Sequence, residues 1–373
     1  MNKKIQIRSL IHILCLFALI LPDQKLLNSE TILIKNGKIF PITSKPIRDG
    51  FLLIQNHKIA KISTKLEDDI PAGAKVIDAT GMYIYPGMIG LMTSIGVTGY
   101  PGAGNDQNET GVFTPHMDPY DALNPEDNTI EVTRIGGVTT VQTTSGSQNV
   151  FSGKSIVIDL AGNIPSEMIL IRNSGQIINT AAKRENQFPS TTPGTIAMIR
   201  DKLNNARSYM ENQKKSPKQE EKSSAPYTEN SKIDLEMEAL IPIITGETKT
   251  IFITSDEISL RNALNMISEY KLNGIIVASR GIHKYLDQLA QHKIPVIWGG
   301  TTTVPDRWEP YDLYYRTASQ LAEKNILFAF ISGGFGGGSY NVRNLPVPAA
   351  LSVAHGLKEE EAIKALTIKG ENI

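Results

Sequence analysis

The chain has few of the side chains that carry thiol and imidazole chemistry. Its 373 residues include one cysteine, Cys15, and six histidines. One cysteine cannot form a disulfide within its own chain, and Cys15 lies in a segment that we expect to act as an export signal. The mature protein is therefore predicted to have neither a disulfide nor a thiol nucleophile. The 38 basic and 38 acidic side chains leave no net charge, so charge gives no argument for nucleic-acid binding and we expect none.

The N-terminal segment, residues 1–30, has the pattern of a signal peptide with a short leader. Lys3, Lys4 and Arg8 precede a mostly apolar run of 11 residues, which is shorter than the roughly 20 residues that a membrane-spanning helix needs. No pair of small residues in the usual cleavage spacing precedes Glu30. We expect an exported protein that is periplasmic or secreted, and an uncleaved signal that anchors it to the membrane is the alternative.

Residues 31–85 predict a small β-sheet region. Residues 31–40 alternate apolar and polar side chains up to Asn36-Gly37, a dipeptide typical of hairpin turns. A later stretch repeats the pattern around Asn56-His57, so a second hairpin is predicted there.

Strand and helix patterns alternate in the second half of the chain. The predicted strands are 138–142, 155–160, 251–253, 274–278, 295–298 and 326–331, and the predicted helices are 131–135, 195–209, 257–270, 283–292, 313–324, 349–355 and 358–368. Apolar strands separated by helices indicate a parallel sheet with both faces covered. The number of units favours a closed barrel, and a doubly wound open sheet is the structural alternative. Residues 210–232 are charged and of low complexity, which predicts a mobile surface loop.

Residues 76–96, VIDATGMYIYPGMIGLMTSIG, place Pro86-Gly87 between a short strand and an apolar run. This stretch resembles the amidohydrolase superfamily, and the run at 114–125 is similar to its imidazolonepropionase-like, secreted branch. The resemblance implies an α/β fold, a (β/α)8 TIM-type barrel over 86–373 preceded by a partial β-sandwich over 31–85. It also implies a hydrolase that acts on the carbon–nitrogen bonds of non-peptide amides.

The metal ligands of this family are absent from the matching positions of the sequence. Members end the first barrel strand with Asp-x-His-x-His, where this chain has Gly90, Met92 and Ser94. The expected ends of the fifth, sixth and eighth strands contain no histidine or aspartate either. They read Ile-Phe-Ile-Thr-Ser at 251–255, Ala-Ser-Arg at 278–280 and Ser-Gly-Gly-Phe at 332–335. Zinc is the family metal, but these substitutions predict a degenerate metal site and no metal cofactor.

One histidine is a candidate catalytic residue. His116 lies in the Gly- and Pro-rich stretch 97–128, which is a predicted pocket lid because long loops after barrel strands line the active-site face. The other histidines fall in the signal, a hairpin or predicted helices. His116 is therefore the one expected on the pocket side.

Five further residues are candidates for ligand binding. Lys183 corresponds to the modified lysine that the resemblance implies, although it lies in a polar run. Gly333 and Gly334 belong to a glycine-rich run whose backbone N–H groups could form an anion nest. Arg343 and Asn344 follow that run, and Arg343 would be the cation for a carboxylate-bearing ligand.

Family members continue beyond the last barrel helix and return to finish the sandwich, whereas this sequence stops at Ile373. We expect an exposed sandwich face that a second copy or a partner chain covers. Two functions stay open: an exported hydrolase acting on carbon–nitrogen bonds with a degenerate metal site, or a non-catalytic binding or scaffold member. Either would take a small molecule with an amide or carboxylate group. A truncated remnant is the third reading.

Overall fold

The structure is a computed structural model that describes residues 31–65, 73–98, 106–107, 109–215, 233–331 and 339–373. The predicted signal at 1–30 and residues 216–232 of the predicted loop lie outside this part of the chain. The chain divides into two compact units, Met1–Pro86 and Gly87–Ile373.

The first unit is a five-stranded sheet. Its strands are β1 (Ile32–Ile39), β2 (Ile47–Gln55), β3 (Lys58–Ser63), β4 (Lys75–Asp78) and β5 (Tyr83–Ile84). β2 pairs antiparallel with β1 and β3, while β4 and β5 run parallel to β1. Asn56 and His57 form the predicted turn between β2 and β3, both with positive φ, which confirms that hairpin.

The hairpin predicted at Asn36-Gly37 is wrong. β1 continues through both residues, and Asn36 adopts a φ of 64° where the pairing with β2 is irregular. Asn36 Nδ2 donates to Asp78 Oδ1 (3.2 Å), and a Cβ on Gly37 would stand 2.5 Å from Ile84 Cδ1. The glycine serves the close approach of a neighbouring strand at a bulge, which the dipeptide signal does not distinguish from a turn.

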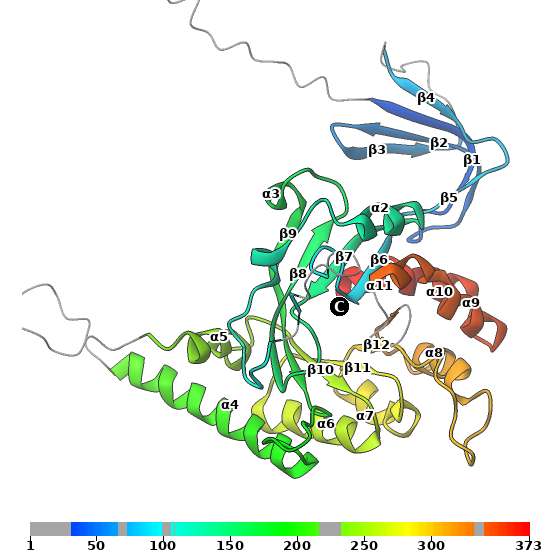
Figure 1. Ribbon diagram of the computed structural model, residues 1–373. Coiled ribbons are helices and arrows are strands. Elements are labelled where there is room, and N and C mark those ends of the chain that lie inside the picture. The colour runs from blue at the N-terminus through cyan, green and yellow to red at the C-terminus, as the bar shows by residue number, and fades with distance from the viewer. Residues whose placement is uncertain (1–30, 66–72, 99–105, 108, 216–232, 332–338) are drawn as a thin grey trace, which may run out of the picture. The chain divides into compact units, whose positions relative to one another are not determined.

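The second unit is built on eight strands that form a nearly closed barrel (Figure 1). They are β6 (Met88–Thr93), β7 (Val138–Thr144), β8 (Phe151–Asp159), β9 (Ile169–Asn179), β10 (Thr250–Thr254), β11 (Gly274–Ala278), β12 (Val296–Trp298) and β13 (Phe328–Phe330). The strands pair in sequence order, and the two end strands, β6 and β13, contact each other. This order confirms the predicted barrel, because a doubly wound sheet reverses its order at a switch point.

One strand departs from the regular pattern. β8 pairs antiparallel with both β7 and β9, whereas the other neighbouring strands are parallel. The expectation of a parallel sheet is therefore wrong at β8, and β9 was not predicted. In β9, residues 170–173 are exposed and residues 175–179 are buried. A strand that extends from solvent into the barrel shows no single two-residue period, which explains why the sequence pattern did not reveal it.

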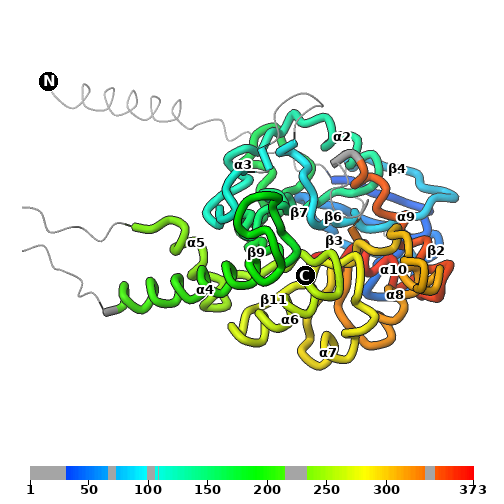
Figure 2. Tube along the Cα trace, turned by 60° about the horizontal axis from the view of Figure 1, so that its bottom comes forward, coloured from blue at the N-terminus to red at the C-terminus, as the bar shows by residue number. Residues whose placement is uncertain are grey.

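Helices cover the outside of the barrel, and Figure 2 shows α6 and α7 side by side at its edge. The helices are α2 (Asn128–Ile135), α3 (Pro165–Met168), α4 (Thr192–Lys215), α5 (Leu235–Ile244), α6 (Glu257–Tyr270), α7 (Leu286–Gln291), α8 (Leu313–Glu323), α9 (Pro346–Ala354), α10 (Glu359–Leu366) and α11 (Ile368–Asn372), with 3₁₀ turns η1 (Pro119–Ala122), η2 (Ile282–Lys284) and η3 (Ser339–Asn344). The predicted helix 283–292 is split into η2 and α7, and the predicted loop 210–232 starts later, because α4 continues to Lys215. Within the described residues, no helix combines the length and apolarity that crossing a membrane requires.

Three helices end in the same backbone geometry before the next strand. Lys271 after α6, Lys293 after α7 and Asn325 after α8 have φ between 52° and 55°. The residue that follows each of them donates its N–H to a carbonyl five residues earlier, at 3.1, 2.9 and 3.0 Å respectively. These bonds are of the kind that closes a helix with a left-handed residue. They direct the chain from each helix into the amino end of a barrel strand.

The barrel interior is filled by aliphatic side chains. They are Leu91, Ile177, Ile251, Ile253, Ile275, Val277, Ile297, Ala329, Ile331 and Ile373. A second and larger core, which includes Phe252 and Trp298, lies between the strands and the helices. The alternation of Ile251, Phe252 and Ile253 between the two cores is the two-residue period of a strand. The interior is thus a packed core, as in other barrels of this type, and not a channel.

Candidate functional site

The carboxyl ends of the parallel barrel strands, termed the mouth below, are where proteins with this fold place their ligands. The residues at the last position of these strands or the next one include Thr93, Ser94, Thr144, Asn179, Thr254, Ser255, Ser279 and Gly299. Ser255 and Ser279 follow the inward-facing Ile253 and Val277 by two residues, so strand alternation directs them toward the mouth. None of these positions holds a histidine or a carboxylate. The strand-end positions themselves therefore carry neutral groups, most of them hydrogen-bonding.

Buried threonines join the first two barrel strands at the mouth. Thr93 Oγ1 donates to the Gln142 carbonyl (3.0 Å), and Thr143 Oγ1 donates to the Ile95 carbonyl (2.8 Å). Met92, at a position where the family has a metal-binding histidine, has a φ of 54° beside an irregularity in the pairing of β6 with β7. These hydroxyl groups are used to hold backbone that leaves the regular ladder. They are structural groups and not activated nucleophiles.

The end of the fourth strand carries an asparagine. Asn179 Nδ2 donates to the Ser147 carbonyl (2.6 Å), and Asn179 Oδ1 accepts from the Ala181 N–H (2.8 Å). The predicted Lys183 lies four residues beyond the strand and is exposed. Its role in ligand binding stays a prediction.

Arg184, the next residue, was not singled out from the sequence. Its guanidinium donates to the carbonyls of Glu109, Thr110 and Gly111 and to Asn149 Oδ1 (2.5 Å). Asn149 Nδ2 donates to the Glu109 carbonyl (3.2 Å) as well. Arg184 therefore fixes the loop that leads to His116. Its only sequence signal is a position beside Lys183, in a run that reads as solvent-exposed.

His116 lies on the mouth side of the barrel. The residues around it are bonded to β8, because Thr114 N–H donates to the Phe151 carbonyl (3.0 Å) and Lys154 N–H donates to the Met117 carbonyl (2.9 Å). Since β8 runs antiparallel, its beginning lies at the mouth. His116 Nδ1 is buried and has no hydrogen-bond partner among the described residues. The imidazole is thus held in place by its neighbours while one ring nitrogen stays free of any described partner.

Arg343 and Asn344, two further predicted ligand-binding residues, lie in η3. Both are exposed, and a Cβ on Gly136 would stand 2.8 Å from Arg343 Cβ. Gly136 lies two residues before Val138, the first residue of β7, so Arg343 lies beside the amino end of that strand. Gly333 and Gly334 fall outside the described residues. The proposed binding roles of these four residues stay predictions.

A cluster of charged and aromatic residues follows the sixth and seventh strands. Arg280 contacts Asp306 (3.2 Å) and the Tyr314 hydroxyl (3.2 Å), and Tyr314 donates to Glu309 (2.8 Å). Burial and the Glu309 hydrogen bond raise the pKa of Tyr314 to about 12. Burial acts to raise the pKa of Glu309, but hydrogen bonds from the Asp306 N–H and the Tyr314 hydroxyl, with the Arg280 charge, hold it below its ordinary value. This ion cluster was also not predicted from the sequence.

His283 lies near this cluster. Burial, with the neighbouring Lys284 charge, lowers the pKa of His283. Its Nδ1 is buried and has no hydrogen-bond partner among the described residues. The sequence reading placed His283 on a barrel helix, whereas it belongs to η2, directly after the sixth strand.

The described residues do not fit the zinc that the family resemblance implies. Zinc in proteins is bound by imidazole, thiolate and carboxylate groups. Among the residues that the structure describes, no group of three or more His, Cys, Asp or Glu side chains is placed to hold a metal ion. Met92, Ser94, Ser255 and Ser279 occupy strand ends without such a group. Ser332 and the residues up to 338, after the eighth strand, lie outside the described part of the chain.

No family model matches the chain. An amidohydrolase of known structure from Thermotoga maritima MSB8 is 30% identical to it, with a TM-score of 0.79 and with 91% of this chain and 88% of that chain covered. Among curated proteins, a D-hydantoinase from Geobacillus stearothermophilus is 51% identical over 59 residues, and a 5'-deoxyadenosine deaminase from Methanobrevibacter smithii is 34% identical over 97 residues. The chain spans only 12% and 22% of these two proteins. The Thermotoga structure, in contrast, is matched along most of its length at 30% identity, and this chain therefore belongs to the amidohydrolase superfamily.

Proposed function

We propose that this protein binds a small molecule with an amide or carboxylate group at the mouth of the barrel, without a metal ion. The observation that carries the proposal is the set of side chains at the strand ends: Ser255 and Ser279 offer hydroxyl groups, and Asn179 keeps one N–H and one oxygen lone pair beyond its bonds to Ser147 and Ala181. An amide both donates and accepts hydrogen bonds, and hydroxyl and carboxamide groups match it in both directions. The degenerate metal site is part of this proposal.

The packed interior supports binding on top of the barrel and not within it. Ile253, Val277 and Ile297 are buried in the interior core directly below the mouth. A ligand would meet this apolar floor with one side and the strand-end hydroxyl and carboxamide groups with its polar atoms. Pockets of this composition, apolar with a few placed polar groups, are typical of small-molecule sites.

Hydrolysis of the bound amide without a metal is the second candidate function. It is favoured by His116, whose Nδ1 lacks a described partner while its flanking residues are bonded to β8. A neutral imidazole in that position could accept a proton from an attacking water. The superfamily, and the hydrolase-type proteins in it, make a carbon–nitrogen bond the target to test.

We also propose that the protein is exported, on the strength of the signal pattern at residues 1–21. A second copy or a partner chain would cover the apolar side chains that the first unit exposes. Val76 on β4 and Tyr83 on β5 are 51% and 61% exposed, which is high for apolar side chains on strands.

The first test is the metal content of the folded, purified chain by elemental analysis, before and after zinc reconstitution. We expect no stoichiometric zinc and no change in thermal stability with a chelator. One zinc ion per chain would contradict the proposal of metal-free binding, and His116 would then be tested as a zinc ligand.

The second test is binding and turnover of a hydantoin, a cyclic diamide, and of a linear N-acyl amino acid. We expect saturable binding. Ser279→Ala should weaken it by about tenfold, the usual effect of losing one hydrogen bond. Product formation that survives a chelator and disappears in His116→Ala would establish the hydrolase. Absence of binding to either compound class would overturn the proposal for an amide ligand.

A further inference from the structure

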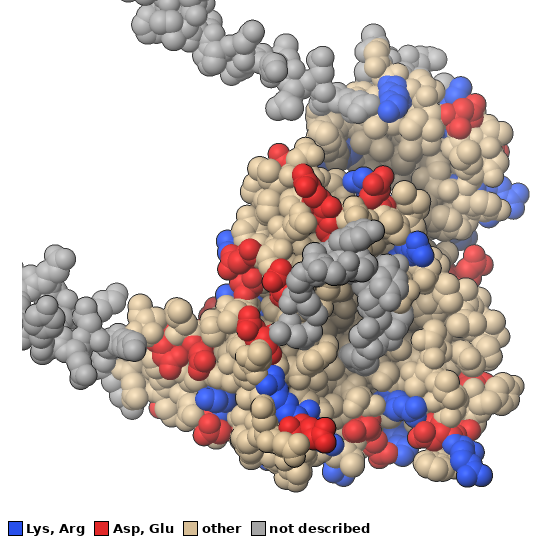
Figure 3. Space-filling view, viewed as in Figure 1, with Lys and Arg blue, Asp and Glu red and all other residues tan. Residues whose placement is uncertain are grey.

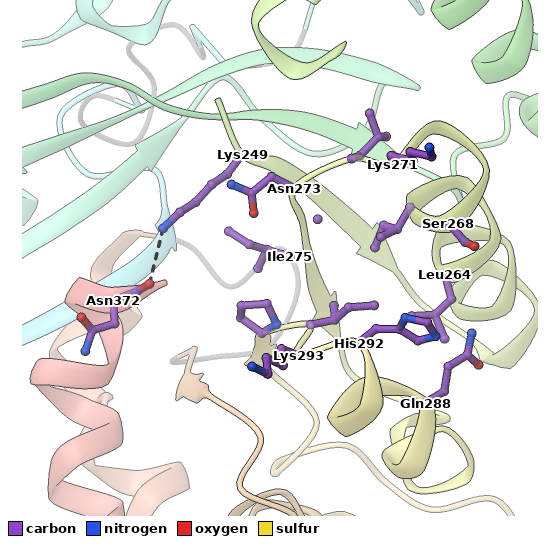
Figure 4. Close-up of a pocket in the computed structure, with 15 residues that line it drawn as sticks. Lys249, Leu264, Ser268, Lys271, Asn273, Ile275, Gln288, His292, Lys293 and Asn372 are labelled. Carbon is purple, nitrogen blue, oxygen red and sulfur yellow. Dashed lines mark hydrogen bonds between the residues drawn. The ribbon is translucent and has the colours of Figure 1, made fainter. Parts of the chain in front are cut away.

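The end of the barrel opposite the mouth contains a pocket of about 440 Å³ (Figure 4). It lies where α6 and α7 lead into β11 and β12, and Asn372 of α11 closes one side of it. Its apolar lining includes Leu264, Ile275 and Pro295. A pocket of this size is large enough for a small organic molecule.

The charges that line this pocket are of one sign. Lys249, Lys271 and Lys293 line it together with His292, and the described lining residues include no aspartate or glutamate. The remaining polar lining, from Ser268, Asn273 and Gln288, adds hydroxyl and carboxamide donors. The lining therefore has a large excess of hydrogen-bond donors and positive charge.

Two of the lysines have no partner within the described part of the chain. Among the described residues, the ammonium groups of Lys271 and Lys293 make no hydrogen bond and no ion pair. The nearby Lys284, in contrast, is paired with Glu257, and Lys324 is paired with Asp287. Both signs of charge occur over α6 and α7 on the face shown in Figure 3. Carboxylates are thus available on these helices, yet the pocket lysines are left without them.

The third lysine reaches into the pocket wall. Figure 4 shows the Lys249 side chain extending to α11, where its ammonium donates to the Asn372 carbonyl (3.4 Å) and to the Ile373 carbonyl. Burial lowers the pKa of Lys249. An ammonium group has three N–H donors, so one remains for a ligand after these two bonds.

Helix termination does not explain the lysines. A cation near a helix C-terminus is favoured by the helix dipole, but the left-handed turn after α8 has the same geometry with the neutral Asn325. In the last turn of each helix, one carbonyl is already bonded to the backbone: Ile267 accepts from the Leu272 N–H and Leu289 accepts from the Ile294 N–H. Lysine at positions 271 and 293 is therefore not a requirement of the fold.

We propose that this pocket binds a small molecule with an oxyanion, a phosphate or carboxylate group, that pairs with one of the lysines lining it, Lys271, Lys293 or Lys249, and with an apolar part against Leu264 and Pro295. The site is at the opposite end of the barrel from the mouth and does not depend on the function proposed there. Ammonium groups without partners are ready to form charge-assisted hydrogen bonds, and they need break no existing ion pair to do so.

The test is titration calorimetry of the full chain with inorganic phosphate and with hexanoate, at an ionic strength held constant with sodium chloride. Saturable binding is expected, and the double variant Lys271→Asn/Lys293→Asn should weaken it by about tenfold or more, because each lost charge-assisted bond is a strong one. Asparagine is chosen because it tolerates the left-handed conformation of both positions. Circular dichroism checks that the variant is folded.

The matched control is Lys58→Asn/Lys358→Asn, which removes two exposed lysines that do not line the pocket. It should leave the affinity unchanged. Tighter binding of phosphate would assign a phosphorylated ligand, and tighter binding of hexanoate would assign a carboxylate with an apolar chain. No saturable binding of either anion, or equal weakening in the control, would overturn the proposal, since attraction would then be due to overall charge.

Discussion

The two ends of the barrel use their cations in different ways. At the mouth, Arg184 is bonded to three backbone carbonyls and to Asn149, and Arg280 is bonded to Asp306 and Tyr314. At the amino end, Lys271 and Lys293 have no partner in the described residues. Proteins with this fold usually place ligand chemistry at the mouth. Here the strand ends at the mouth carry neutral groups and the arginines beside them are paired within the protein, whereas Lys271 and Lys293 at the other end are unpaired among the described residues.

The aliphatic interior keeps these two environments apart. Ile297 is fully buried there, between Val277 on β11 and Ala329 on β13. Charges at one end are separated from the other end by a dry core, so each site can be altered alone.

The largest effect is expected from breaking that core. Ile297→Asp would bury a carboxylate with no partner, and loss of about 3–5 kcal/mol or complete unfolding is expected. Ile297→Val is the control and should cost only about 0.5–1.5 kcal/mol. Urea denaturation measures both. If Ile297→Asp were as stable as Ile297→Val, water would reach the interior and the two ends could not be treated as separate.

The sequence predicted most of the fold, because the barrel strands from residue 250 onward carry clear patterns. The predicted strand 274–278 and helix 257–270 match β11 and α6 in full. β9 was missed since only half of it is buried. The Asn36-Gly37 hairpin was wrong because the same dipeptide suits a bulge.

The residues of the candidate site were much harder to predict from the sequence than the fold was. The position of His116 in the predicted pocket lid singled it out, and the structure places it on the mouth side. The same reasoning could not reveal Arg184, which bonds to backbone carbonyls over 70 positions away. Such contacts leave no local pattern. The amino-end pocket had no motif either, since Lys271 and Lys293 look like ordinary helix-end residues until the folded chain places them around one cavity.

A medium effect is expected at Arg184, which tests whether the mouth arginines are structural. Arg184→Ala should free the loop at 109–117, raise its amide hydrogen exchange and cost about 1.5–3 kcal/mol, the range for hydrogen bonds to charged groups. Arg184→Lys should recover only part of this, because an ammonium cannot fork between several acceptors. Arg261→Ala, an exposed site without a described partner, is the control. Unchanged exchange in Arg184→Ala would show that the guanidinium is dispensable for the loop.

The smallest effect concerns pH, at His283 beside the Arg280 cluster. Because burial lowers the pKa of His283 below its ordinary value, the unfolded chain binds a proton more readily than the folded one as the pH falls below about 6.5. Stability should therefore decrease from pH 7.5 to pH 5 more steeply in the natural protein than in His283→Gln. Lys284→Gln, which removes the neighbouring charge that also disfavours the imidazolium, should reduce the slope in part. Thermal unfolding across this range measures all three proteins. If stability fell with pH equally steeply in the natural protein and in His283→Gln, the folded and unfolded states would bind a proton at His283 equally well. The Arg280 cluster beside it would then be solvated and not buried.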